Sequence, residues 1–436
     1  MRALLVDTIP LRTPAFRRLW LGRTISAVGG QLTLVAIMFQ VWEATRSPLW
    51  SGAVAVASAV PMVVVGLWGG GLLDRGDRRR IALAATTGQL ACSLLLAAQA
   101  ATRPSVAAVL VLLGVQTAFQ AVSQPATQTF TPRLLPADQV AAGLALSRLG
   151  GQAALLGGPA MAGVLLGYGG LTACYVIDAA TFAAGLYGVF GLPPMRPLGA
   201  GARRGAAGII DGFRFVRDEP IVRGAMVTDL AATALAMPIS LFPVINQERF
   251  GGDPRTLGLF LSAIAFGGAL ASVFSGAFTR RSRPGAVMVG AAACWAAALA
   301  VFGLAGSPWL GFGLLVVAGA ADTVSVVSRG TLIQLATPDE LRGRISSVEL
   351  VVGISGPDLG NVRAGAVAQA TTATFALVTG GVACLAVLAA NVATSRRLLT
   401  FRGQETNAPD STSQRPSADH DAGVRLHHVH DARVVP

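Results

Sequence analysis

The chain has 436 residues, of which 53% are hydrophobic and only 13% are charged, and its mean hydropathy is +0.60. A soluble domain carries about 25% charged residues, so this chain has too little charge to cover the surface of one or two soluble domains. The composition therefore argues against a soluble enzyme, confines disorder to the ends of the chain and predicts a protein embedded in lipid.

Twelve long apolar runs follow one another along the chain, separated by short polar loops. A membrane helix needs about 20 apolar residues, and the runs are too long and too continuous to be strands of a β-barrel. We therefore predict an all-α membrane protein with twelve transmembrane helices, at about 16–42, 50–73, 81–101, 105–127, 139–167, 170–191, 221–247, 256–279, 285–305, 308–331, 342–367 and 371–394.

Arginine is distributed unevenly among the loops between these runs. All 34 basic residues are arginines, and most of them fall in cytoplasmic loops if the N-terminus is placed inside the cell. Positive loops mark the cytoplasmic side of a membrane protein, and this explains the net charge of +12 better than binding to nucleic acid does. The pattern predicts a multi-pass protein of the cytoplasmic membrane with both termini in the cytoplasm.

The two halves of the sequence resemble each other. Residues 14–17 match 220–223, the region of Gly52 matches that of Gly258, and the loop at 135–138 matches the loop at 337–340. Parallel repeats with a binding site between them are a common plan of transporters. We predict two pseudo-symmetric six-helix bundles at 1–192 and 221–395, a cytoplasmic linker at 193–220 with a short amphipathic helix over 209–217, and a disordered cytoplasmic tail at 396–436.

The loop after the second run combines a glycine, an acid and several arginines. Its sequence from Gly70 to Arg80, GGLLDRGDRRR, resembles the loop 2–3 signature of the major facilitator superfamily. An ordinary basic cytoplasmic loop is the alternative interpretation. The resemblance implies a conformational latch that holds the two bundles in one state, and the residues that would form it are Gly70, Asp74, Arg75, Arg78 and Arg79.

Two further stretches narrow the resemblance to one branch of that superfamily. Residues 112–136 and 338–347 resemble the macrolide-efflux and enterobactin-exporter branch, and the overall resemblance covers about residues 10–395. It implies a secondary active transporter, a proton-coupled antiporter, that exports a drug (as in multidrug resistance), a secondary metabolite or a siderophore. Part of an antiporter signature also appears, although close helix packing explains it equally well; its residues are Gly158, Pro159 and Gly163 in span five, with Gly356 and Pro357 in span eleven.

Several charges lie inside the predicted spans, where each costs at least ~2.5 kcal/mol on insertion scales unless it has a partner or a wet cavity. The superfamily fold places spans seven and ten on the central cavity, so we predict Asp229 and Asp322 as sites for a proton or a cationic substrate. A structural pair of Asp322 with Arg329, two turns later, is the alternative. Asp178 is expected to anchor span six in its bundle, and Arg23 to extend toward the membrane surface.

Uncharged polar residues and one arginine complete the predicted pathway. Arg148 and Gln152 share a face of span five, where they are placed to hold an anionic group. The remaining cavity wall is expected to be mostly apolar, with Gln31, Gln116 and Gln120 as sparse polar contacts. Such a wall suits a bulky amphipathic small molecule.

The sequence gives little indication of a metal site or a cofactor. The four cysteines lie singly inside apolar runs, and all four histidines lie in the tail at 420–430, so we expect no metal site and no cofactor. The spans contain no histidine, which disfavours a membrane enzyme, and the absence of lysine excludes a P-loop for ATP within this chain. The predicted partners are a small-molecule substrate, protons and the bilayer, for a chain acting as a monomer. A non-transporting sensor or scaffold and an importer are the alternatives.

Overall fold

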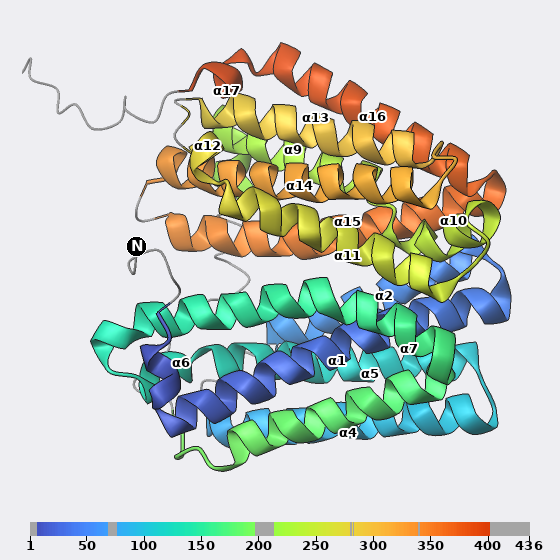
Figure 1. Cartoon of the computed structure of the whole chain (residues 1–436). Helices are drawn as coiled ribbons and strands as arrows, with labels where there is room; N and C mark the ends of the chain where they lie inside the picture. Colours follow the sequence, from blue (N-terminus) through green and yellow to red (C-terminus); the bar gives the residue numbers. More distant parts are fainter. Residues whose placement is uncertain are drawn as a thin grey trace, which may run out of the picture.

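A computed structural model of the chain describes residues 7–68, 76–196, 213–279, 281, 283–338 and 341–401. Within these ranges every regular element is a helix and there is no strand, as predicted. The helices form two groups that lie one above the other in Figure 1, the first coloured blue to green and the second yellow-green to red.

The first group contains the helices α1 (Pro14–Thr45), α2 (Pro48–Trp68), α4 (Arg78–Thr102), α5 (Val106–Gln128), α6 (Thr131–Leu134) and α7 (Val140–Phe190), with the 3₁₀ turns η2 (Ile9–Arg12) and η3 (Ala137–Gln139). The second group contains α9 (Pro220–Ala236), η4 (Ile239–Leu241), α10 (Phe242–Arg249), α11 (Pro254–Val273), α12 (Gly276–Thr279), α13 (Pro284–Phe302), α14 (Pro308–Ala336), α15 (Arg342–Ala370), α16 (Ala373–Thr394) and α17 (Arg396–Thr400). Of the predicted amphipathic helix at 209–217, residues 213–217 are helical and 209–212 lie outside the described residues.

Ten of the described helical segments are long and apolar enough to cross a membrane. One of them holds two predicted spans, because α7 reverses its direction at Gly170, whose φ of 72° favours glycine. Helix α15 carries more charge than the other spans, yet it lies between α2, α9 and α16. The described helices are thus consistent with the twelve predicted spans.

Side chains in the loops before several helices fix where those helices begin. Asp77, Ser105, Asp253, Ser307 and Thr372 each accept a hydrogen bond from a backbone N–H in the first turn of the following helix. Such caps satisfy N–H groups that have no partner within the helix. Polar residues in the short loops therefore determine where the apolar helices begin.

The seventh span differs from the continuous run predicted at 221–247. Helix α9 ends at Ala236, because Met237 precedes Pro238 and takes an extended conformation. Asn361 on α15 satisfies the backbone at the break: the Ser240 N–H donates to the Asn361 Oδ1 at 2.9 Å, and the Ser240 hydroxyl donates to the Asn361 carbonyl oxygen at 3.0 Å. Tertiary contacts thus stabilise an interruption that periodicity alone did not reveal.

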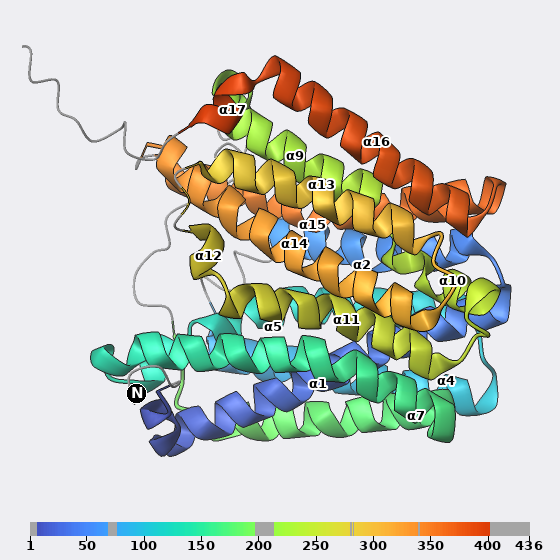
Figure 2. The same ribbon diagram turned by 45° about the horizontal axis from the view of Figure 1, so that its top comes forward.

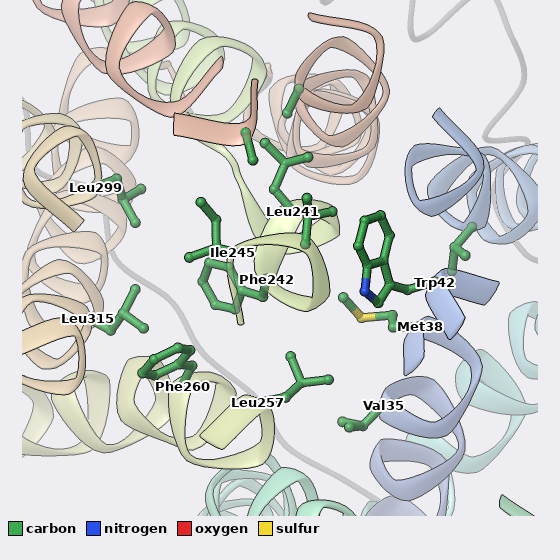
Figure 3. Packing of buried hydrophobic residues seen from close by; sticks show 14 of the residues in the cluster. Val35, Met38, Trp42, Leu241, Phe242, Ile245, Leu257, Phe260, Leu299 and Leu315 are labelled. Carbon is green, nitrogen blue, oxygen red and sulfur yellow. The ribbon is translucent and has the colours of Figure 1, made fainter. Parts of the chain in front are cut away.

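The two ends of the molecule differ in how the helix groups share their cores. We call the end where α1 begins and α17 lies the terminal end, and the opposite end, which carries α10, the far end (Figure 1). At the far end one large apolar cluster joins both groups, with Val35, Met38 and Trp42 of α1 facing Phe242 of α10 and Leu257 of α11 (Figure 3). At the terminal end the apolar clusters each belong to one group.

Candidate functional site: the seam and the buried charges

Two helix pairs form the seam between the groups, α2 with α15 and α7 with α11. Both views place α11 where the groups meet (Figures 1 and 2). In one pair, a Cβ added to Gly258 would meet the Pro159 carbonyl oxygen and the Gly163 Cα. In the other, a Cβ added to Gly365 would meet the Pro48 carbonyl oxygen and the Gly52 Cα. Glycine is therefore required for the backbones to approach this closely.

These glycine contacts lie toward the far end, where two polar contacts also connect the groups. The Ser47 hydroxyl donates to the Gln369 Oε1 at 2.7 Å, and the Arg255 guanidinium lies 4.4 Å from the centroid of the Tyr168 ring. Gly52 and Gly258 occupy matching positions of the sequence repeat, so the two glycine contacts are related to each other. The groups are thus held together at the far end by backbone packing, a hydrogen bond and a cation–π contact.

The first group contains a fully buried acid, Asp178 on the second arm of α7. Its Oδ2 accepts hydrogen bonds from the Thr33 and Ser93 hydroxyls, both at 2.6 Å, and from the Gln116 amide at 3.4 Å. The Thr181 hydroxyl lies 3.5 Å from the Asp178 Oδ1. Helices α1, α4, α5 and α7 thus meet at one carboxyl group, which fits the predicted anchoring of span six.

This arrangement places Gln116 differently from the sequence prediction. Gln116 was expected on the cavity wall, but it is buried inside the first group and donates to both Asp178 and Ser93. A second buried network lies nearer the far end, where the Tyr175 hydroxyl donates to the Gln40 Oε1 at 2.7 Å and Gln40 bonds to Gln99. The buried polar side chains around Asp178 and Gln40 therefore bond to one another across helices.

The second group contains an ion pair between Asp229 on α9 and Arg329 on α14. The two side chains are 10% and 14% exposed, respectively. Glu349 on α15 also interacts electrostatically with Arg329. One arginine is therefore shared between acids of two neighbouring helices, and the predicted alternative of an Asp322–Arg329 pair does not occur, because Asp229 takes the guanidinium.

Asp322 lies two turns from Arg329 on α14, and its side chain is half-buried. Within the described part of the chain it has no hydrogen bond and no ion pair. A carboxyl group in such a place takes up a proton, binds a cation or is hydrated in a water-filled cavity. Asp322 is thus a free acid on the same helix as a paired arginine.

The other predicted pathway residues occupy varied positions. Arg148, Gln152 and Gln120 are exposed, while Gln31 on α1 is half-buried and packs over Gly158 of α7. The structure thus leaves the three side chains on α5 and the first arm of α7 exposed, whereas Gln31 is partly occupied in helix packing.

The predicted packing motif lies at points where helices touch. Pro159 and Gly163 form the α7 side of the seam with α11. A Cβ on Gly356 of α15 would clash with the Thr233 side chain of α9, and Pro357 lies inside α15 one residue later. These residues therefore bring α15 close to α9 and α7 close to α11.

The predicted latch falls largely outside the described residues, which exclude Gly70, Asp74 and Arg75. Of its other members, the Arg79 guanidinium donates to the Phe190 carbonyl, and the Arg78 N–H donates to the Met195 carbonyl at 3.1 Å. Asp77 accepts from the Met195 N–H at 2.9 Å and from the Arg79 N–H at 3.0 Å. The start of α4 is therefore tied to the segment that follows α7 within the same group.

Asp77 lies outside the membrane-spanning segments, and its surroundings favour the ionised form. Partial desolvation acts to raise the pKa of Asp77, but the N–H groups of Met195, Arg79 and Arg80 together hold that pKa below its usual value of 3.8. The carboxylate therefore stabilises this contact as an anion.

Sequence reasoning missed a small pocket at the terminal end of the first group. Arg23 was expected to extend toward the membrane surface, but it lines this pocket together with Trp20 of α1, Thr131 of α6 and Ser147 of α7. The empty volume is about 420 Å³, including the open mouth. The available sequence signal was the α1 spacing that places residues 16, 20, 23 and 27 on one face.

Comparison with known proteins gives two results at the level of sequence. A family model described as "Transmembrane secretion effector" matches residues 7–424. Curated relatives include the enterobactin exporter EntS of Shigella dysenteriae serotype 1 and of Escherichia coli O157:H7. Each is 30% identical over 387 residues, covering 86% of this chain and 92% of the relative.

Solved structures of similar shape are also transporters. The nucleoside transporter NupG matches with a TM-score of 0.70 at 13% identity, covering 88% of this chain and 98% of that one. A peptide transporter POT, solved in complex with sulfate, matches with a TM-score of 0.70 at 14% identity, covering 90% of this chain and 96% of that one. At such low identity these likenesses establish the fold and nothing about substrate.

Proposed function

The chain belongs to the transmembrane secretion effector family of the major facilitator superfamily, and from this premise we propose that it exports a siderophore-like molecule in exchange for protons. The observation that carries the proposal is the similarity to enterobactin exporters over almost the whole chain. We further propose that it acts as a monomer in the cytoplasmic membrane with both termini in the cytoplasm.

Family membership confirms several predictions from the sequence. The predicted superfamily and its exporter branch are correct, the chain is a multi-pass membrane protein, and its all-helical fold matches known transporters. Because the family and the relatives are transporters, the chain is a secondary transporter and not an enzyme.

The direction of transport fits the arrangement of the helix groups. Arginine-rich loops support a cytoplasmic terminal end, and the glycine seams would then close the external side. Packing at the far end and separate cores at the terminal end correspond to a state that faces the cytoplasm, in which an exporter would load its substrate. Rocking of the two groups about the seam would then expose the substrate to the outside.

Proton coupling is supported by the acids of the second group. Asp322 is half-buried and has no hydrogen bond or ion pair to any residue that the structure describes, so it can alternate between a neutral and a charged form as the two sides of the membrane become accessible. Asp229 and Arg329 are already paired, so a change in the charge of Asp322 on the same helix face would alter the field at that pair.

A secretion assay tests the proposal. An efflux-deficient bacterium that lacks its own siderophore exporter would express this chain, and the siderophore in the medium and the susceptibility to a panel of bulky amphipathic drugs would be measured. We expect increased secretion or decreased susceptibility, both abolished by a protonophore. No change for any compound would favour a sensor or scaffold, and faster accumulation inside the cells would favour an importer.

A further inference from the structure

The pocket at the terminal end of the first group has an aromatic wall and a cationic wall. Phe16 and Leu19 are each 1% exposed and form its floor, and the Trp20 Nε1–H donates to the Leu146 carbonyl at 2.8 Å. The indole ring is therefore fixed in place. Arg23 lies one turn further along the same helix and lines the same space.

Within the described part of the chain, no acid neutralises the charge of Arg23. Its Nη1 donates to the Thr127 carbonyl at a long distance of 3.4 Å, and the described residues that line the pocket include no acid. Among the residues that the structure describes, Arg23 forms no ion pair. A guanidinium offers five N–H donors, so most of its hydrogen-bonding capacity remains available to a ligand.

The pocket lies on the side of α1 that faces α5 and the first arm of α7. Another face of α1 packs on the second arm of α7: a Cβ added to Gly22 would meet Gly185 and Gly188, and the Ser26 hydroxyl donates to the Thr181 carbonyl. The first arm contributes Ser147 and Gly151 to the pocket, adjacent in sequence to the exposed Arg148 and Gln152. The pocket thus adjoins the polar residues predicted for the pathway.

We propose that this pocket binds an aromatic anion, with the charged oxygen on Arg23 and the ring against Trp20. A half-buried guanidinium that no described acid pairs with lowers its free energy by binding an anion, and a fixed indole favours a flat ring. The inference rests on the proposed export function and deepens it: the pocket holds an acidic aryl group of the substrate at the side from which the substrate loads.

Binding of benzoate, with neutral benzamide as the matched ligand, tests this proposal without requiring transport. The full chain would be placed in phosphatidylcholine nanodiscs and its affinity for each compound measured by calorimetry. Arg23→Gln should weaken benzoate binding roughly tenfold or more, since a hydrogen bond to a charged group is worth that much. Arg17→Gln, an exposed change on the same helix, should have no effect, and benzamide should bind weakly to every variant.

A second pair of variants covers the case in which Arg23→Gln fails to fold. A Cβ on Gly151 or on Gly157 meets no other atom within 4 Å, but only Gly151 lines the pocket. Gly151→Leu should therefore fill the pocket and abolish benzoate binding, whereas Gly157→Leu should leave it intact. Equal binding by these two variants, or equal binding of benzoate and benzamide, would overturn the proposal.

Lipid headgroups are the other possible source of an anion at this site. Replacing part of the phosphatidylcholine by phosphatidylglycerol should leave benzoate affinity unchanged if the pocket serves the substrate. If phosphatidylglycerol weakens benzoate binding and Arg23→Gln abolishes that effect, the pocket binds a lipid headgroup and the proposal is overturned. If secretion persists although benzoate does not bind, the pocket is not an anion-binding site, and the proposed export function is unaffected.

Discussion

The two helix groups treat their buried acids in different ways. In the first group Asp178 is fully enclosed and receives hydrogen bonds from Thr33 and Ser93 at 2.6 Å. In the second group Asp229 is paired with Arg329, and Asp322 has no partner among the described residues. One half therefore fixes its acid with neutral donors, while the other combines a charge pair with a free acid.

The difference separates a structural acid from exchangeable ones. Asp178 bonds to side chains of three helices, so a change in its charge would disturb the packing of the whole bundle. Arg329 lies among acids of two neighbouring helices and can change partner without loss of the bundle. We infer that the first group supplies a rigid body and that the second supplies the groups that respond to protons.

The largest effect is expected from breaking the ion pair of the second group. Arg329→Gln should lower the free energy of unfolding by about 3 kcal/mol, because it leaves the nearly buried Asp229 without its partner. The double variant with Asp229→Asn should recover part of that loss. Thermal or denaturant unfolding in detergent measures both, and strictly additive effects of the two changes would show that the residues are not coupled.

Removal of the structural acid should have a slightly smaller effect. Asp178→Ala should cost about 2 kcal/mol of unfolding free energy, because the hydroxyls and the amide that face it lose their acceptor. Asp138→Ala, a change at an exposed acid of the same group, serves as the control in the same unfolding experiment. If both variants unfold like the original chain, Asp178 does not anchor the first group.

Adding a single methyl group tests the close packing at the seam between the two helix groups. Gly258→Ala should cost about 1–2 kcal/mol and impair transport, because the added methyl group would press on the backbone of α7 at Pro159 and Gly163. Gly157→Ala adds the same methyl group in open space and should be neutral. Melting temperature and secretion would be measured together, and equal behaviour of the two variants would show that close packing at the seam is not needed for stability or transport.

The smallest effect is expected outside the membrane, at the contact between Asp77 and Met195. Asp77→Ala should cost about 1 kcal/mol, the usual value of a helix N-cap. Because the folded state holds the pKa of Asp77 below 3.8, its stabilising effect is present above that pH and is lost as the pH falls through the folded pKa. If the stability difference between the original chain and Asp77→Ala grew as the pH is lowered, the expected pH dependence would be wrong.

The all-helical membrane fold followed from the sequence to a large extent, because composition reports directly on a lipid environment. Run lengths predicted helices close to those observed, such as α13 at Pro284–Phe302. Local patterns did not reveal the break after Ala236 or the burial of Gln116, since both depend on side chains far away in sequence. The pairing of Arg329 with Asp229 instead of Asp322 was likewise a matter of how α9 and α14 pack.

The sequence therefore singled out the charged residues of the candidate site, but it did not show which of them interact with each other. Asp229, Asp322 and Arg329 stood out because a charge inside an apolar run is costly. Periodicity places residues on a helix face, but it does not specify which neighbouring helix that face meets. Arg23 illustrates the same limit, because its pocket needs residues from α6 and α7 that lie more than 100 positions away.

Transport into reconstituted liposomes with an imposed pH gradient tests whether Asp322 couples transport to protons. The original chain should transport the substrate identified by the secretion assay faster when the gradient is present. Asp322→Asn should still bind that substrate and equilibrate it but should show no acceleration by the gradient. An Asp322→Asn variant that responds to the gradient as the original chain does would contradict the assignment of proton coupling to the second group.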